Sequence, residues 1–144
     1  MTDLIEVRAA NLVGAALDWA VAEVEGIETS WRYGRELVQV HDRGGIKLVE
    51  SIRSIYSPSI DWSQGGPLID KHQASAHYQA HLADAQFRYS AGPAGSGFWC
   101  YGPTALVAFC RSLVKAKLGD TVQVPKELLI DIDKEATWAT STRS

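Results

Sequence analysis

The sequence predicts a small single-domain α+β protein in which one antiparallel β-sheet packs against two main α-helices. Segments near residues 11–26 and 103–118 repeat apolar residues at helical spacing, and residues 35–55 are rich in β-formers on both sides of a turn. The 144 residues, 46% hydrophobic and 22% charged, have the size and composition of one compact domain. We therefore expect one domain over residues 1–132, followed by a polar tail, 133–144.

Composition also limits the possible partners. The formal net charge of −3 gives no overall attraction to phosphate backbones, so duplex nucleic acid is not expected. No apolar run approaches the roughly 18 residues of a membrane span, and the N-terminal residues do not resemble a signal peptide. We expect a cytoplasmic protein with no membrane segment. Cys100 and Cys110 each lie in an apolar run and are expected to be free, buried thiols.

The elements of the N-terminal half follow from local patterns. In the first helix Asn11 is expected to cap the N-terminus and Gly26 to supply the left-handed residue that ends it. The turn of the following hairpin is placed at 42–45. Residues 56–67 combine two prolines, paired glycines and short polar side chains, which predicts a long loop.

The C-terminal half is expected to alternate short strands with one long helix. Strands are predicted at 74–82 and 86–90, although the first stretch would also tolerate a helix within 71–85. A flexible turn at 92–97 precedes a short buried strand at 98–101.

The long helix begins at Gly102–Pro103–Thr104 and stops before Gly119, and Val122, Val124 and Pro125 suggest a closing strand after it. One face of this helix is expected to be apolar and the other polar. The first carries Leu106, Cys110, Leu113 and Val114, and the second carries Arg111, Ser112 and Lys115.

Three stretches resemble the NinX-like accessory proteins of phages and prophages. They are residues 14–22, 56–69 and 102–125, in the family's order. The middle stretch joins a proline, an aspartate, a tryptophan and a double glycine in one segment, a combination that rarely arises by chance. The resemblance implies a phage genome and action in the cytoplasm of an infected bacterium, and it assigns no biochemical activity. In residues 71–97 we identify no stretch that resembles the family.

The predicted loop 56–67 is the first candidate site, because long structured loops in compact domains commonly carry function. Tyr56 and Trp62 would stack on a planar ligand, and Asp61 would accept hydrogen bonds from a sugar hydroxyl or a base amine. The alternative is that Pro58 and Trp62 pin the loop to the core while Asp61 caps a local turn. The remaining proposed contributors are the hydroxyls of Ser57 and Ser59 and the close-approach glycines Gly65 and Gly66.

The start of the second long helix is another candidate, because free amides and the helix dipole favour an anion there. Gly102 and Thr104 would contribute directly, with Tyr101 beside them. A phosphate would also need a cation, and Arg53 is assigned to the site, although each arginine is also compatible with a solvated surface charge. The arginines considered are Arg32, Arg35, Arg53, Arg88 and Arg111.

Metal and catalytic patterns are weak. His72, His77 and His81 lie close in sequence, but a zinc site would need a further ligand such as Asp70 or Asp84, so we expect surface histidines, no metal and no cofactor. Nucleophile-elbow, phosphate-loop and dinucleotide-binding patterns are missing from the sequence.

The sequence therefore favours a non-enzymatic binder of a small anionic or nucleotide-like ligand, held between loop 56–67 and the helix start at 102–104. By analogy it would sequester a host immune signal. A small nucleotide hydrolase with Asp61 or a histidine as base is one alternative. A host-protein adaptor with an apolar patch around Trp31, Tyr33 or Trp99 is another. The apolar content is also compatible with a homodimer.

Overall fold

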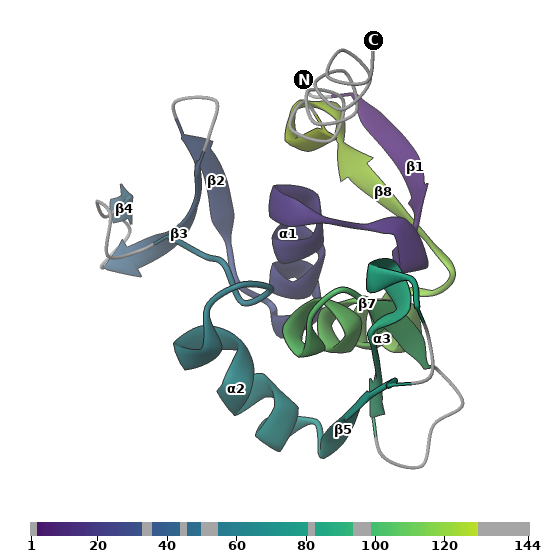
Figure 1. The fold of residues 1–144 in the computed structure, drawn as a ribbon. Coiled ribbons are helices and arrows are strands. Elements are labelled where there is room, and N and C mark those ends of the chain that lie inside the picture. The colour runs from purple at the N-terminus through teal and green to yellow at the C-terminus, as the bar shows by residue number, and fades with distance from the viewer. Residues whose placement is uncertain are drawn as a thin grey trace, which may run out of the picture.

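The computed structural model has three α-helices in its described part, with several short strands around them (Figure 1). The helices are α1 (Gly14–Glu25), α2 (Trp62–Lys71) and α3 (Ala105–Leu118), and short 3-10 turns occur at η1 (Ala9–Asn11), η3 (Ala85–Phe87) and η4 (Lys126–Leu129). Helices α1 and α3 lie at the centre of Figure 1. The structure describes residues 3–32, 36–43, 46–49, 55–80, 83–93 and 99–129.

The described strands form three small antiparallel sheets. Strands β1 (Leu4–Arg8) and β8 (Thr121–Pro125) make a two-stranded pair. The second sheet has the order β2–β3–β4 and the third has the order β5–β6–β7, which leaves β7 at an edge. The bounds of these strands are β2 (Thr29–Arg32), β3 (Glu36–Arg43), β4 (Ile46–Val49), β5 (Ala74–Tyr78), β6 (Tyr89–Pro93) and β7 (Cys100–Gly102).

The α+β class is confirmed, but the described chain has three sheets and a third helix in place of one sheet and two main helices. Strands β1 and β2 were not predicted. Strand β1 has side chains that are exposed or only half-buried, so it lacks the alternation that marks a strand. Its partner, β8, lies at the other end of the described chain.

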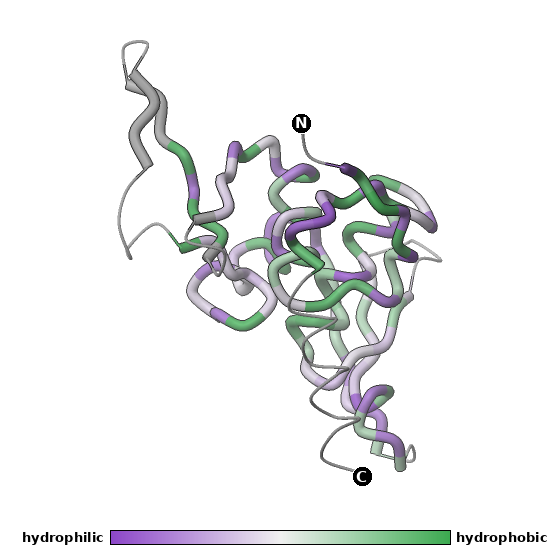
Figure 2. Tube along the Cα trace, turned by 90° about the horizontal axis from the view of Figure 1, so that it is seen from above, coloured by the Kyte–Doolittle hydropathy of each residue, from purple (hydrophilic) through white to green (hydrophobic). Residues whose placement is uncertain are grey.

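The core forms where α3 packs against α1 and against the β5–β6–β7 sheet. Leu17 and Val21 of α1 and Phe109 and Leu113 of α3 belong to one hydrophobic cluster, and all four side chains are fully buried. Figure 2 shows apolar and polar residues alternating along the helices, as expected of helices with a buried face. The predicted apolar face of α3 is buried, as expected.

The predicted polar face of α3 is partly wrong, because Arg111 and Ser112 are also buried. Helix α3 is covered on several sides, by α1, η1 and the third sheet, so a face that looks solvent-directed in sequence is enclosed. The Ser112 hydroxyl donates to the Phe109 carbonyl at 2.7 Å, which satisfies it within the helix.

The helix ends agree only partly with the predictions. Gly26 has φ of 70°, and the left-handed stop of α1 is confirmed. Asn11 does not cap α1: it lies in η1, and the cap residue is Val13, with no side-chain bond. In α3, Thr104 is the cap, and its hydroxyl oxygen accepts from the Val107 N–H at 3.1 Å.

The predicted long loop is wrong beyond Asp61, because α2 begins at Trp62 and contains Pro67. Gly65, Gly66 and Pro67 are poor helix formers, so the sequence pattern did not predict this helix. Asp61 supplies the missing stabilisation as N-cap, with Oδ1 accepting from the Ser63 N–H at 2.9 Å.

The hairpin of β3 and β4 and the strands β5, β7 and β8 fall where strands were predicted. The predicted strand at 86–90 is instead η3 followed by β6, which takes in Gly92 and Pro93 from the predicted turn. Residues 94–98 and the tail 130–144 lie outside the described residues.

Gly65 allows α2 to approach α3 closely. A Cβ at this position would lie 2.4 Å from the Pro58 carbonyl oxygen and 2.7 Å from Leu106 Cδ2. At the neighbouring Gly66 the nearest atom, on the Trp62 ring, would be 3.8 Å away. The two glycines therefore have different roles.

We predict that Gly65→Ala lowers the free energy of unfolding by about 1–3 kcal/mol, because backbone at Pro58 must move to admit the methyl group. The matched variant Gly66→Ala should leave stability unchanged or raise it by up to about 1 kcal/mol, because alanine favours the helix. Urea unfolding of both variants checks this. Equal effects would contradict the assigned contact.

Candidate functional site

The segment that precedes α2 is fastened to α1 by a buried carboxyl group. Asp18 is only 5% exposed, and its Oδ1 accepts from the Ser59 N–H at 2.9 Å. Burial raises the pKa of Asp18 to about 6, and the bonds from Ser59 partly oppose this. Pro58 and Ser59 are buried beside it, so Ser59 holds the chain in place.

Tyr56 also points into the interior and is only 7% exposed. Its hydroxyl has no hydrogen-bond partner in the described part of the chain. Burial raises the pKa of Tyr56 well above its usual range, and the nearby Glu25, Cys110 and Asp18 raise it further.

Asp61 and its neighbours form a local hydrogen-bond network at the start of α2. Oδ1 of Asp61 accepts from the Ser63 N–H at 2.9 Å and from the Ser63 hydroxyl at 2.7 Å, and these bonds lower the pKa of Asp61. Gln64 Oε1 accepts from the Ser57 N–H at 2.9 Å. A hollow of about 440 Å³ includes Tyr56 and Asp61 in its lining. Trp62 is 59% exposed and is not part of that lining.

The two predicted parts of the site, the loop 56–67 and the start of α3, pack directly against each other. Gly65 of α2 lies against Leu106 near the start of α3. Gly102 lies against the first turn of α3, where an added Cβ would be 2.7 Å from the Ala108 nitrogen. Thr104 caps its own helix. Arg53 lies outside the described residues.

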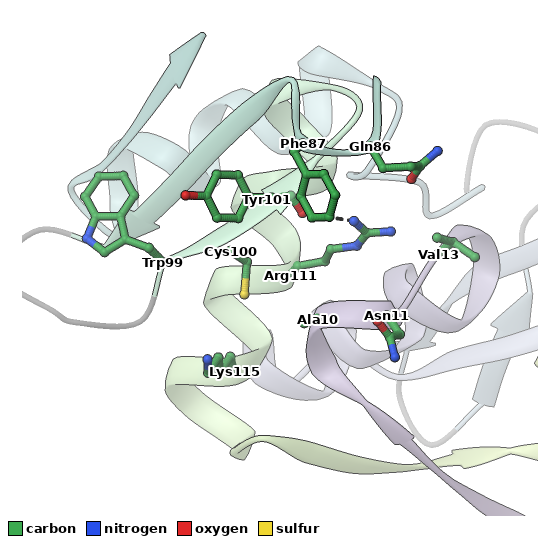
Figure 3. Close-up of a pocket in the computed structure, with 10 residues that line it drawn as sticks. All are labelled: Ala10, Asn11, Val13, Gln86, Phe87, Trp99, Cys100, Tyr101, Arg111 and Lys115. Carbon is green, nitrogen blue, oxygen red and sulfur yellow. Dashed lines mark hydrogen bonds between the residues drawn. The ribbon is translucent and has the colours of Figure 1, made fainter. Parts of the chain in front are cut away.

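Tyr101 belongs to a different pocket, at the open edge of β7 (Figure 3). This cavity has a volume of about 480 Å³. It lies between β7, α3 and the η1 turn, and we call it the Arg111 pocket. Its functional lining consists of the aromatics Phe87, Trp99 and Tyr101, the cations Arg111 and Lys115, and the carboxamides Asn11 and Gln86.

Arg111 lines this pocket and is only 6% exposed. Its Nε donates to the Leu12 carbonyl at 2.8 Å and its Nη1 donates to the Tyr101 carbonyl at 2.9 Å. A guanidinium carries five N–H groups, so three remain for other acceptors. Among the described residues no carboxylate pairs with it. Burial lowers the pKa of Arg111, but guanidinium groups remain protonated in proteins.

The aromatic side chains form a partly exposed wall. Phe87 and Tyr101 meet edge to face with centroids 5.6 Å apart, and Trp99 lies 5.6 Å from the ring of His77. Between 40% and 46% of the surface of each of Phe87, Trp99 and Tyr101 is exposed. Such rings provide flat apolar surface for stacking.

The pocket has a positive local charge within an acidic protein. Lys115 lies one helical turn after Arg111, and its Nζ is 3.9 Å from Oδ1 of Asp120, which is itself 77% exposed. An exposed pair at this distance contributes little. Buried Cys100 also lines the pocket, and burial raises the pKa of its thiol while Lys115 and Arg111 partly oppose the shift. The arrangement is suited to holding an anion with a planar ring.

The sequence carried one signal for this pocket that the prediction did not use. Arg111 and Lys115 are like charges four residues apart, a spacing that destabilises a helix unless something compensates. Arg111 is one of the five arginines considered as phosphate partners and one of the residues placed on the polar face of the helix, but Arg53 is the arginine that the prediction assigns to the site.

The histidines are dispersed. His72 Nε2 lies 2.7 Å from Glu25 Oε2, and Lys71 donates to Oε1 of the same residue at 2.6 Å. Burial would raise the pKa of Glu25, but the bonds from Lys71 and His72 lower it overall. His81 lies outside the described residues. In the described part of the chain no three His, Cys, Asp or Glu side chains gather as a metal site would require.

These features define a small α+β protein with a cationic, aromatic-walled pocket at the edge of a sheet. Residues 8–117 match the family model described as bacteriophage P22, NinX. The match covers well over half of the chain, so the protein belongs to the NinX family, as the three resembling stretches predicted. The search of curated proteins returned no match. Helices in the described ranges are too short or too polar to cross a membrane.

We predict that Asp18 makes stability fall as pH rises. Its folded pKa of about 6 exceeds the unfolded value of about 3.9, so its contribution is fully present below pH 4 and is lost as pH rises through 6. Asp18→Asn keeps an oxygen for the Ser59 N–H and removes the titration. Relative to this variant, the wild type should lose up to about 3 kcal/mol between pH 4 and 7.

Urea unfolding of both proteins at several pH values measures this difference. Asp70→Asn removes an exposed carboxyl from α2 and serves as the control for charge. A wild-type minus Asp18→Asn difference that stays constant with pH would refute the role of Asp18.

Proposed function

We propose that this NinX-family protein is a non-enzymatic binder that sequesters a small anionic, nucleotide-like ligand in the Arg111 pocket. This proposal rests mainly on the buried guanidinium of Arg111. Among the residues that the structure describes, its hydrogen-bond partners are two neutral carbonyl groups. Taking an uncompensated charge out of water is costly, and a bound anion would offset that cost. Arginine also presents the planar fork that suits phosphate.

The shape and lining of the cavity support an organic ligand over a bare ion. Its volume of about 480 Å³ lies in the usual range for small-molecule sites. The exposed rings of Trp99, Tyr101 and Phe87 would stack on a base, and the carboxamides of Asn11 and Gln86 would hydrogen-bond to its edge.

A binder is favoured over a nucleotide hydrolase by what lines the Arg111 pocket. The lining residues that the structure describes include no carboxylate and no imidazole, the usual general bases. The raised pKa of the Cys100 thiol also disfavours it as a nucleophile. In a phage setting, such a protein would act in the host cytoplasm on a nucleotide signal, a proposal made by analogy.

A host-protein adaptor is the second candidate, favoured by the exposure of Trp99 beside Tyr101 and Phe87. Trp31 packs against the core, and Tyr33 lies outside the described residues. If the pocket is an adaptor surface, a host protein that binds the wild type should bind the Trp99→Ala variant at least tenfold more weakly, and saturating nucleotides should not compete.

We predict that a thermal-shift screen of nucleotides and cyclic nucleotides identifies a stabilising ligand. At a hundred times its dissociation constant, the ligand should add about 2.7 kcal/mol of stability. Tyr101→Ala should weaken binding about tenfold or more through lost stacking, while keeping the main-chain carbonyl that accepts from Arg111. Arg111→Lys should weaken it further, because lysine lacks the planar fork.

Tyr78→Ala is the matched control. Like Tyr101, Tyr78 is an exposed tyrosine of the β5–β6–β7 sheet, but it is outside the lining of the Arg111 pocket. Ligand recovered unchanged after denaturation supports a binder, whereas altered products would support an enzyme. A screen in which no nucleotide stabilises the protein would refute the proposal.

A further inference from the structure

Helix α3 directs two cations into the same cavity. Arg111 and Lys115 both line the Arg111 pocket, and four residues of helix separate their Cα atoms by about 6 Å along the axis. Two like charges at this spacing oppose each other within the helix. An anion that reaches both side chains would offset this repulsion.

The two cationic groups serve different ends of the pocket. In Figure 3 the guanidinium of Arg111 extends toward the side lined by Asn11, Val13 and Gln86. Lys115 lies on the other side, near Cys100 and on the side of Trp99. The rings of Tyr101 and Phe87 stand along the wall of the pocket above them in this view.

Among the described residues, no carboxylate pairs with Arg111, and the one ion pair of Lys115 is long. Arg111 bonds to two carbonyl groups, and Lys115 has only the long contact of 3.9 Å with an exposed aspartate. A single phosphate seated on the fork of Arg111 would leave Lys115 with only its long pair to Asp120. A second phosphate would be held by Lys115 as a point charge.

We infer that the ligand of this pocket carries two phosphate groups, one bound by Arg111 and one by Lys115. This inference rests on the proposed function and specifies its ligand. Adjacent phosphates, as in a nucleoside diphosphate, and separated ones, as in a cyclic dinucleotide, share this chemistry. The experiment distinguishes these two sources.

The test is isothermal titration of the full chain with adenosine and guanosine monophosphates, diphosphates and cyclic dinucleotides. We expect a ligand with two phosphates to bind about tenfold more tightly than the matching monophosphate. Lys115→Ala should abolish this preference, so that the ligand with two phosphates binds no more tightly than the matching monophosphate. Lys117→Ala removes the same charge from an exposed position on α3 outside the pocket lining, so the preference should survive.

The outcomes distinguish the two-phosphate ligand from the more general proposal that the Arg111 pocket binds a nucleotide. A preference for the diphosphate identifies adjacent phosphates, and a preference for the cyclic dinucleotide identifies separated ones. Equal binding of monophosphates and two-phosphate ligands, with no effect of Lys115→Ala, would overturn this inference and leave the binder intact. Binding of none of these nucleotides would count against both.

Discussion

The hydrogen bonds of Arg111 hold together three parts of the molecule that are distant in sequence. From the middle of α3, its guanidinium reaches the Leu12 carbonyl between η1 and α1, and the Tyr101 carbonyl on β7. Leu12 is fully buried, so its carbonyl group would be costly to leave unpaired, whereas the bond to the Tyr101 carbonyl is only partly buried. The edge of the third sheet and the entry to α1 are thereby fixed to one side of α3.

A second buried charge fastens the other side of the core. Asp18 accepts the Ser59 N–H and so docks the segment that leads into α2. The two groups are satisfied differently. A carboxyl group can take up a proton when burial is unfavourable, as the pKa of about 6 indicates. A guanidinium cannot, so Arg111 keeps its charge, and this difference supports the proposal that the Arg111 pocket holds an anion.

What the sequence predicted was set by local patterns. Periodic apolar residues marked α1 and α3, and the β-formers around residues 42–45 marked the hairpin of β3 and β4. Helix α2 escaped prediction because its stability comes from the Asp61 cap and from packing of Gly65 on Leu106. The burial of Arg111 was not predicted because the packing of a helix on several sides depends on tertiary structure, which local sequence patterns do not show. Of the predicted site residues that the structure describes, only Tyr101 lines the Arg111 pocket.

Structural and binding roles at Arg111 do not compete, because they use different N–H groups. The two carbonyl bonds fix the plane of the guanidinium, and the three remaining N–H groups then have set directions before any ligand arrives. Such preorganisation lowers the entropy cost of binding. A ligand anion would in turn neutralise the charge that the fold keeps buried, so binding and folding at this junction are thermodynamically linked. Under the proposed function, position 111 therefore connects the stability of the protein to the occupancy of the Arg111 pocket.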